Sequence, residues 1–75
     1  MTTVTVRLNS IEKVRDFVNI VTKFDYDFDL VHGRFVIDAK SIMGIYSLDL
    51  SKDVELVIHT DEADDVKAAL AAFIV

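Results

Sequence analysis

The chain has 75 residues and a formal net charge of −5 at pH 7, because 13 Asp and Glu outnumber eight Lys and Arg. This length allows one small domain over residues 1–75, and the negative charge disfavours nucleic acid and anionic membrane surfaces as partners. Hydrophobic residues make up 52% of the sequence and Cys is absent, which indicates a folded globule without disulfide bonds or thiolate metal sites.

The first two expected elements are a strand and an amphipathic helix. Apolar and polar residues alternate over residues 3–8, which predicts a strand with one buried face. Apolar residues then recur at helical spacing and predict a helix from residue 11 to about residue 24. Either Asn9 or Ser10 can cap this helix, and Asn9 with Glu12 resembles a capping box. The expected inward stripe consists of Ile11, Val14, Phe17, Val18 and Val21.

A hairpin is expected next. Three Asp residues alternate with apolar residues over residues 25–30, which predicts a second strand. The following His32-Gly33 is the type of pair that closes a two-residue turn, because Gly adopts positive φ without steric cost. Pairing across that turn places Leu30 opposite Phe35, so that the apolar side chains of the second and third strands share a face.

The remaining elements are a short helix, a strand and a last helix. Ser41 is expected to cap a short helix over residues 42–46, and alternation over residues 54–59 predicts a fourth strand. Thr60 or Asp61 is expected to open the last helix, whose first turns are rich in carboxylates that favour the positive end of the helix dipole. Its expected inward stripe consists of Val66, Ala69, Leu70 and Phe73.

The expected order of elements is therefore β-α-β-β-α-β-α. Each of the four strands has one apolar face, and the helices are amphipathic, which predicts an α+β fold. We expect an open-faced two-layer sandwich in which the helices cover one face of a four-stranded antiparallel sheet. The other face of the sheet is expected to contact solvent.

Two segments of the sequence carry a resemblance to a known family. They are Thr22-Lys23-Phe24-Asp25 and, above all, Ala39-Lys40-Ser41-Ile42-Met43-Gly44-Ile45-Tyr46-Ser47-Leu48. Together with the element order, they resemble the HPr family, the phosphocarrier proteins of the bacterial sugar phosphotransferase system. The resemblance runs without a gap from residue 22 nearly to the C-terminus, and it implies an HPr-like fold with two phosphorylation positions.

The first of these positions is altered. In the family, a His at the start of the first helix, followed closely by Arg and Pro, carries the phosphoryl group. Counting back from Phe17 and Val18 places Ser10 at the His position, Glu12 at the Arg position and Lys13 at the Pro position. A phosphoimidazole passes its phosphoryl group onward, whereas a phosphate ester on Ser10 is a stable product. Glu12 also places a negative charge where phosphate needs a cation, so we expect no His phosphocarrier function.

The two His residues of the chain are not expected to replace the lost carrier. His32 is expected in the hairpin turn and His59 at the end of the fourth strand, where both are ordinary exposed residues. A relay that survived on another residue would give an acid-labile phosphate. Ser10, Glu12 and either His do not form a hydrolytic set, since no oxyanion hole or ordered base accompanies them, and no enzyme activity is expected.

The second position is retained at Ser41, as the resemblance implies. In Gram-positive members the matching Ser is phosphorylated by HPr kinase, and the product binds a transcriptional regulator of catabolite repression. A helix N-cap suits a dianionic phosphate because nearby backbone amides stabilise it. Without the resemblance, Ser41 is a plain N-cap that contributes about 1 kcal/mol. The expected partner-binding patch consists of Ile42, Met43, Ile45 and Tyr46, of which at least one or two are expected to be buried.

The chain therefore resembles the catabolite-repression HPr type, which lacks the carrier His and keeps the regulatory Ser. The leading hypothesis is a regulatory protein of the phosphotransferase system and carbon catabolite control, with HPr kinase and the catabolite control regulator as protein partners. Glu12 departs even from that type, which normally has a basic residue near the lost His. The alternative is an HPr-fold protein–protein interaction domain with neither phosphorylation role.

No metal or cofactor is expected. Asp25, Asp27 and Asp29, with Asp38 expected opposite Asp27, could suggest a hard-cation site because Ca²⁺ and Mg²⁺ prefer carboxylates. However, Asp residues at this spacing spread along a strand, and no Gly-containing ligand loop accompanies them. A solvated sheet face explains these residues better.

The sequence also predicts where the protein resides. No segment approaches the ~20 apolar residues of a membrane span, and the N-terminal residues lack the features of a signal peptide. We therefore expect a cytoplasmic protein without membrane contact. The apolar run over residues 68–75 is expected to be mostly a packing helix, with Ile74 or Val75 available for a dimer contact.

Overall fold

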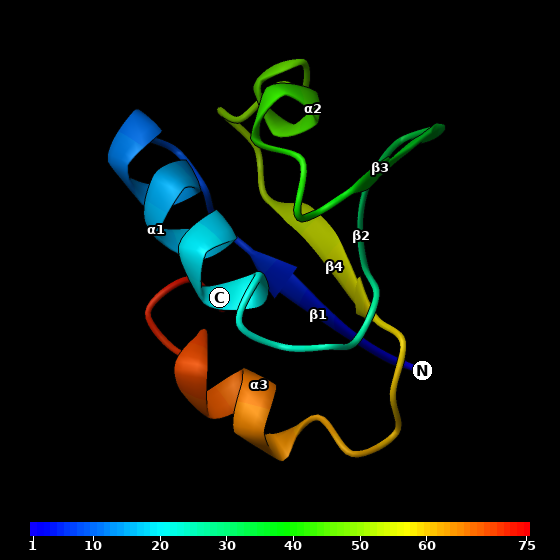
Figure 1. Cartoon of the computed structure of the whole chain (residues 1–75). Coiled ribbons are helices and arrows are strands. Elements are labelled where there is room, and N and C mark those ends of the chain that lie inside the picture. Colours follow the sequence, from blue (N-terminus) through cyan, green and yellow to red (C-terminus); the bar gives the residue numbers. More distant parts are fainter.

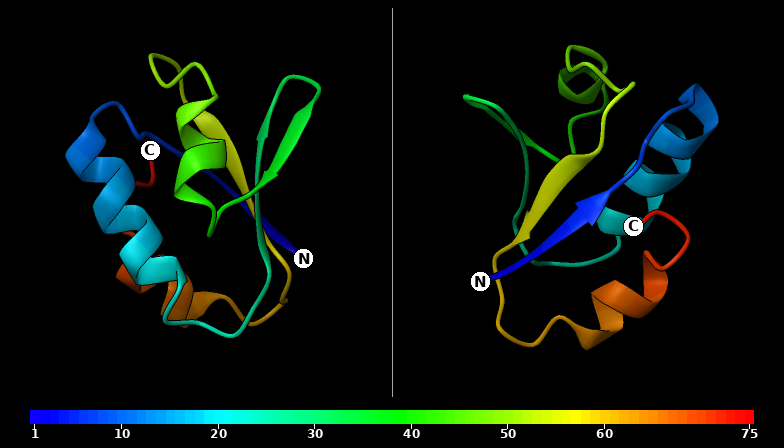
Figure 2. Two further views of the ribbon diagram at one scale, coloured as in Figure 1. Left: turned by 45° about the horizontal axis from the view of Figure 1, so that its top comes forward. Right: turned by 180° about the vertical axis from the view of Figure 1, so that it is seen from behind.

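A computed structural model describes residues 1–75 and shows a sheet of four strands with three helices on one face (Figure 1). The elements are β1 (Thr2–Val6), α1 (Ile11–Val21), β2 (Phe28–His32), β3 (Phe35–Asp38), α2 (Ile42–Tyr46), β4 (Val54–Ile58) and α3 (Asp64–Ala69). The strands lie in the order β1-β4-β2-β3, and every neighbouring pair is antiparallel. The right view of Figure 2 shows the face that no helix covers. The predicted element order and open-faced architecture are confirmed.

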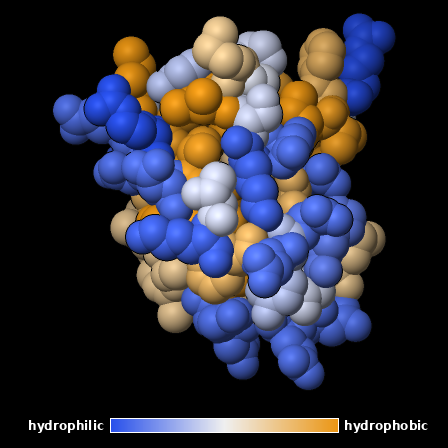
Figure 3. Space-filling view, in the orientation of Figure 1, coloured by the Kyte–Doolittle hydropathy of each residue, from blue (hydrophilic) through white to orange (hydrophobic).

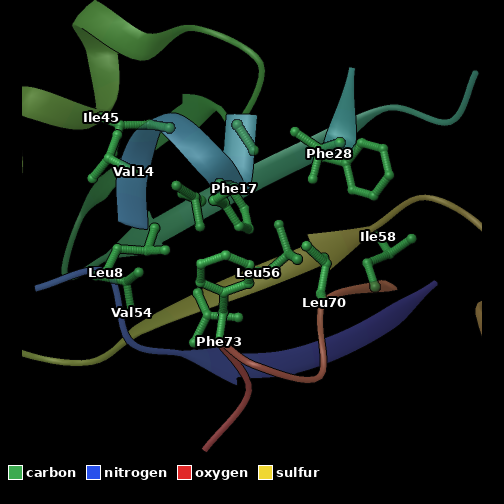
Figure 4. Packing of buried hydrophobic residues seen from close by; sticks show 14 of the residues in the cluster. Leu8, Val14, Phe17, Phe28, Ile45, Val54, Leu56, Ile58, Leu70 and Phe73 are labelled. Carbon is green, nitrogen blue, oxygen red and sulfur yellow. The ribbon is translucent and has the colours of Figure 1, made fainter. Parts of the chain in front are cut away.

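A single apolar core joins the sheet to the helices (Figure 4). All 17 buried residues are hydrophobic, and no polar or charged residue is buried. β2 and β4 contribute alternate residues, as the period of two predicted, β1 contributes Val6, and α1 contributes Val14, Phe17 and Val21. In β3 only Ile37 is partly buried against this core. The rings of Phe17 and Phe73 meet edge to face with their centroids 5.9 Å apart. Every polar group of this protein that could take part in chemistry therefore lies at or near the surface.

The β2–β3 hairpin has a different register from the predicted one. Its turn consists of Gly33 and Arg34, and Gly33 adopts a φ of +61°. His32 therefore pairs with Phe35, where the prediction placed Leu30. A displacement of two residues leaves every side chain on the face it would otherwise occupy, because the side chains of a strand alternate with a period of two. The predicted buried face is thus correct, and the predicted pairing is wrong.

The same displacement changes the pairing of the carboxylates. Asp38 lies opposite Asp29 and not opposite Asp27. Asp25 and Asp27 precede β2, which begins only at Phe28, because the chain bends after the end of α1. The predicted row of three strand carboxylates is therefore reduced to one, Asp29.

Helix α1 is shorter than predicted and carries a narrower buried stripe. It ends at Val21 rather than near Phe24. Ile11, expected to point inward, is exposed because it occupies the first position of the helix, whose buried residues begin with Val14. Val18 is only partly buried. None of the three helices has both the length and the apolar composition that a bilayer crossing needs.

The last helix also begins later than predicted. α3 starts at Asp64, and in the segment before it the Thr60 hydroxyl accepts a hydrogen bond from the backbone N–H of Glu62. Ala69, expected in the inward stripe, is exposed, and Ala63 is buried instead. The predicted helical run to residue 75 is wrong as well. After α3 the chain turns, and Ile74 forms an antiparallel bridge with Val6.

Candidate functional site

The start of α2 presents the first of two exposed Ser hydroxyls that cap helices. Ser41 has an extended backbone, with φ −98° and ψ 100°, and its Oγ accepts a hydrogen bond from the backbone N–H of Gly44 at 3.3 Å. The Ser41 N–H donates to the carbonyl of Asp38 at 3.0 Å, and its carbonyl accepts from the N–H of Ile45 at 3.1 Å. The predicted cap is confirmed. The backbone of Ser41 is thus held from both sides while its side chain remains exposed.

Gly44 leaves space around this hydroxyl. A Cβ at position 44 would lie 3.2 Å from Oγ of Ser41 and 3.7 Å from Cδ1 of Ile37. Contacts near 3.2 Å are tighter than ordinary van der Waals distances, so a larger residue would displace the Ser41 side chain. The small residue therefore keeps the Ser41 hydroxyl both capping and accessible.

The apolar residues of α2 divide between the core and the surface. Ile45 is fully buried and anchors the helix in the core (Figure 4), and Ile42 packs partly against the same core. Met43 is 76% exposed and Tyr46 is 39% exposed. Figure 3 shows that apolar surface gathers around α2 and the hairpin, whereas the end with α3 is mostly hydrophilic. Ile45 must therefore be removed from the predicted patch, and its burial agrees with the expectation that at least one or two of the four residues are inside.

Lys40, the residue before Ser41, holds the chain at the start of α2 through contacts with residues other than Ser41. The ammonium of Lys40 donates to the carbonyl of Phe24 at 2.9 Å and lies 5.6 Å from the centroid of the Phe28 ring. Its backbone N–H donates to Oδ1 of Asp38 at 2.9 Å. Lys40 thus connects the start of α2 to the chain that follows α1. The sequence carries no signal of this contact, because the contact joins residues 16 positions apart through a backbone carbonyl.

The start of α1 presents the second exposed Ser hydroxyl. Ser10 is the N-cap, with φ −151° and ψ 157°, and its Oγ accepts from the backbone N–H of Lys13 at 3.1 Å. Of the two predicted candidates, Ser10 rather than Asn9 is therefore the cap. Arg7 lies shortly before it and binds Asp53 through two hydrogen bonds of 2.9 and 3.2 Å. The hydrogen bond from Arg7 and its positive charge lower the pKa of the Asp53 carboxyl.

Neither His lies at the start of α1. His59 Nε2 is 2.7 Å from Oδ2 of Asp29, at the end of β4. This end of β4 lies beside the beginning of β1, whereas Ser10 follows the far end of β1. His32 is a residue of β2 rather than of the turn, and β4 separates β2 from β1 in the sheet. The pair between His59 and Asp29 has no signal in the sequence, because only the strand order brings the two residues together.

No pocket is present, and no three residues among His, Cys, Asp and Glu are close enough to share a metal ion. Within this structure, the groups best placed for chemistry are the two capping hydroxyls, Ser10 and Ser41. They differ in their neighbours: Ser41 adjoins exposed apolar side chains, and Ser10 adjoins charged ones such as Glu12 and Lys13.

The chain is similar to proteins of known structure and matches one family model. Residues 12–74 match the family model described as PTS HPr component phosphorylation site. The chain is 28% identical to a solved HPr-C-His from Thermoanaerobacter tengcongensis, with a TM-score of 0.79 and coverage of 96% of this chain and 89% of that one. It is 26% identical to the phosphocarrier protein HPr from Bacillus anthracis strain Ames, with a TM-score of 0.72 and coverage of 99% and 94%. The matched residues include all of α2 but begin two positions after Ser10.

Proposed function

The chain belongs to the HPr family of the phosphotransferase system, and we propose that it is a regulatory member that accepts phosphate on Ser41 and carries none on a His. The observation that carries this proposal is the exposed Ser41 hydroxyl at the start of α2, beside exposed apolar side chains, in a chain whose α1 begins with Ser10. By family resemblance, HPr kinase is the proposed donor enzyme. The proposed location is the bacterial cytoplasm.

The geometry around Ser41 suits transfer of a phosphoryl group. Its Oγ accepts one hydrogen bond, from Gly44, so the hydroxyl hydrogen and a further lone pair are available. In the transfer, Oγ bonds to the γ-phosphorus of ATP, the bond from that phosphorus to the bridging oxygen breaks, and ADP leaves. The hydroxyl proton passes to a base of the kinase. Gly44 has no side chain that would crowd Oγ.

The added phosphate changes the surface that a partner meets. It brings a charge of about −1.5 to −2 next to apolar side chains, a combination that a protein with Arg residues beside an apolar surface recognises. Met43 and Tyr46, with the exposed part of Ile42, are the proposed contact residues. The proposed partner is the catabolite control regulator. Ile45 has no part in this contact, since it is buried.

Loss of the carrier role follows from the chemistry at the start of α1. The hydroxyl of Ser10 forms a phosphate ester, which does not pass its phosphoryl group onward as a phosphoimidazole does. Glu12 is exposed beside it, and Arg7 is already paired with Asp53. His59 is paired with Asp29 at the other end of the sheet. We therefore propose that no residue of this chain replaces the His of the relay.

Phosphorylation in vitro tests the proposal. The protein is incubated with HPr kinase and ATP, and mass spectrometry locates the phosphate. We expect it on Ser41, and we expect none in Ser41→Ala. Ser10→Ala is the matched control, because it also removes an exposed capping hydroxyl, and it should be phosphorylated like the unaltered protein. An unmodified Ser41, or equal modification of Ser10, would contradict the proposal.

A second reaction distinguishes the alternatives. The chain is incubated with the phosphoenolpyruvate-dependent enzyme of the phosphotransferase system, and acid-labile phosphate is measured. We expect none, and its presence on His32 or His59 would restore the relay. Absence of phosphate in both reactions would favour the interaction domain that has neither phosphorylation role.

A further inference from the structure

The two edges of the sheet are protected differently. The outer edge of β1 is covered by the C-terminal residues. There, the N–H of Arg7 donates to the carbonyl of Phe73 at 2.8 Å, and the N–H of Val75 donates to the carbonyl of Thr5 at 3.0 Å. The bridge between Val6 and Ile74 lies between these two bonds. The C-terminal residues therefore cover the edge of β1 from Thr5 onward.

The outer edge of β3 is open. β3 pairs only with β2, and in Figure 1 it lies at the margin of the molecule. The N–H of Ala39 donates to the carbonyl of Phe28 at 2.9 Å, which sets the alternation of hydrogen bonds along the strand. Phe35, Ile37 and Ala39 direct their backbone groups toward β2. The N–H and the carbonyl of Val36 therefore point outward and are unpaired.

The side chains of this edge are also unusual for an unpartnered strand. Phe35 is 60% exposed and Val36 is 63% exposed. β3 contains no Pro and no residue with positive φ, so two of the common devices that prevent strand addition are absent, although the strand is short. Arg34 and Asp38 flank the apolar residues, and neither forms a salt bridge within the chain.

We propose that β3 pairs antiparallel with β3 of a second copy of this chain, with Val36 on the two-fold axis. In this register, the outward backbone groups of Val36 exchange hydrogen bonds with those of Val36 of the partner subunit. Phe35 lies opposite Ile37 of the partner subunit. Arg34 lies opposite Asp38 of the partner subunit, and symmetry repeats this pair. The two ends of the strand thus complement each other in charge.

Neighbouring registers lack this complementarity. The outward backbone groups belong to alternate residues, so the register can change only in steps of two. One step places Arg34 opposite Lys40 of the partner subunit, which sets like charges across the strands. A step in the other direction places Arg34 opposite Val36 of the partner subunit and leaves the guanidinium without a carboxylate. Charge therefore selects the register centred on Val36.

The assembly closes at two copies. The contact is the same on both subunits and uses the open edge of each, and the C-terminal residues cover the edge of β1 from Thr5 onward. The result is one continuous sheet rather than a fibre, with the helices of both copies on the same face. β3 has only four residues and each chain carries a net charge of −5, so the buried area is small and the association is weak.

Sedimentation equilibrium with charge-reversal variants tests this pairing. Over concentrations from about 10 μM to about 1 mM, we expect the apparent mass of the unaltered protein to rise toward that of a dimer. Arg34→Asp and Asp38→Arg each place two like-charged pairs across the axis, and each should weaken association about tenfold. An equimolar mixture of the two variants, or the double variant Arg34→Asp/Asp38→Arg, restores both opposite-charge pairs and should restore association.

The controls separate this pairing from folding and from the proposed phosphorylation. Circular dichroism should show that both single variants remain folded, since Arg34 and Asp38 are exposed. Val36→Thr keeps a branched strand residue and should associate like the unaltered protein. Ser41→Ala should associate normally as well, so failure of the phosphorylation proposal does not affect this one. A monomer at all concentrations, or a mixture of variants that fails to associate, would overturn the proposal.

Discussion

The two helices that begin at an exposed Ser, α1 and α2, are held in place by different means. α1 has 11 residues and is anchored by Val14, Phe17 and Val21, all buried. α2 has five residues and only Ile45 is buried. The cap hydrogen bond is similar in both helices, at 3.1 Å in α1 and 3.3 Å in α2. The same cap is therefore a minor part of what holds α1 and a major part of what holds α2.

This difference bears on where a phosphate can act as a switch. A phosphate added at the start of α1 is attached to a helix that three buried residues hold in the core. A phosphate added at the start of α2 is attached to a helix with one fully buried residue. The Ser41 cap and the hydrogen bond from Lys40 to Phe24 also hold this helix in place. Small changes at Ser41 should therefore alter its neighbours more than equal changes at Ser10.

The largest expected effect is on stability when the core anchors are shortened. Phe17→Ala should lower the free energy of unfolding by about 3–5 kcal/mol, and Ile45→Ala by about 2–5 kcal/mol, because each leaves a cavity. Urea denaturation measures both losses. Hydrogen exchange should show that Ile45→Ala exposes the amides of α2 before those of α1. Met43→Ala is the control, since Met43 is exposed and should change stability by less than about 0.5 kcal/mol.

The next effect is that of the caps themselves. Ser10→Ala and Ser41→Ala should each cost about 1 kcal/mol in the free energy of unfolding. The local consequences should differ: hydrogen exchange in Ser41→Ala should accelerate throughout α2, whereas in Ser10→Ala it should accelerate only in the first turn of α1. Equal, whole-helix acceleration in both variants would show that the core does not distinguish the two helices.

A smaller effect is expected from filling the space beside Ser41. Gly44→Ala gains up to about 1 kcal/mol of helix propensity but places a methyl group 3.2 Å from the capping oxygen. We expect the gain in helix propensity and the cost of the close contact to offset each other, so that the midpoint of thermal unfolding changes little. Phosphorylation of Ser41 by HPr kinase should slow by several-fold, since the hydroxyl is displaced. An unchanged rate would show that Gly44 does not keep the hydroxyl accessible.

The smallest effect concerns the ion pair near α1. Arg7 lowers the pKa of Asp53 in the folded protein, so the pair stabilises the fold above the ordinary Asp pKa, and this contribution is lost as pH falls through the folded value. In Arg7→Gln, NMR titration should show the pKa of Asp53 rising toward its ordinary value. Asp49 is the control, because hydrogen bonds from Ser51 lower its pKa and should still do so. No shift at Asp53 would contradict the pairing of Arg7.

The local features of the molecule could be read from the sequence. Alternation with a period of two identified the buried faces of β1, β2 and β4, and a period near 3.6 identified the buried stripe from Val14 to Val21. The Ser41 cap was also predicted, since a cap depends on residues three positions apart. Such features are set by short-range sterics and hydrogen bonding, which the sequence contains in full.

Features that depend on distant residues were decided only by the tertiary structure. The turn at Gly33 and Arg34 set the hairpin register, and packing sent Ile45 inward while it left Ile11 exposed. Strand order brought His59 to Asp29 and turned the last residues against β1. The candidate site shows the same division: the sequence determined the hydroxyl and its cap, and packing determined which apolar neighbours remain exposed, because burial depends on what lies across the core.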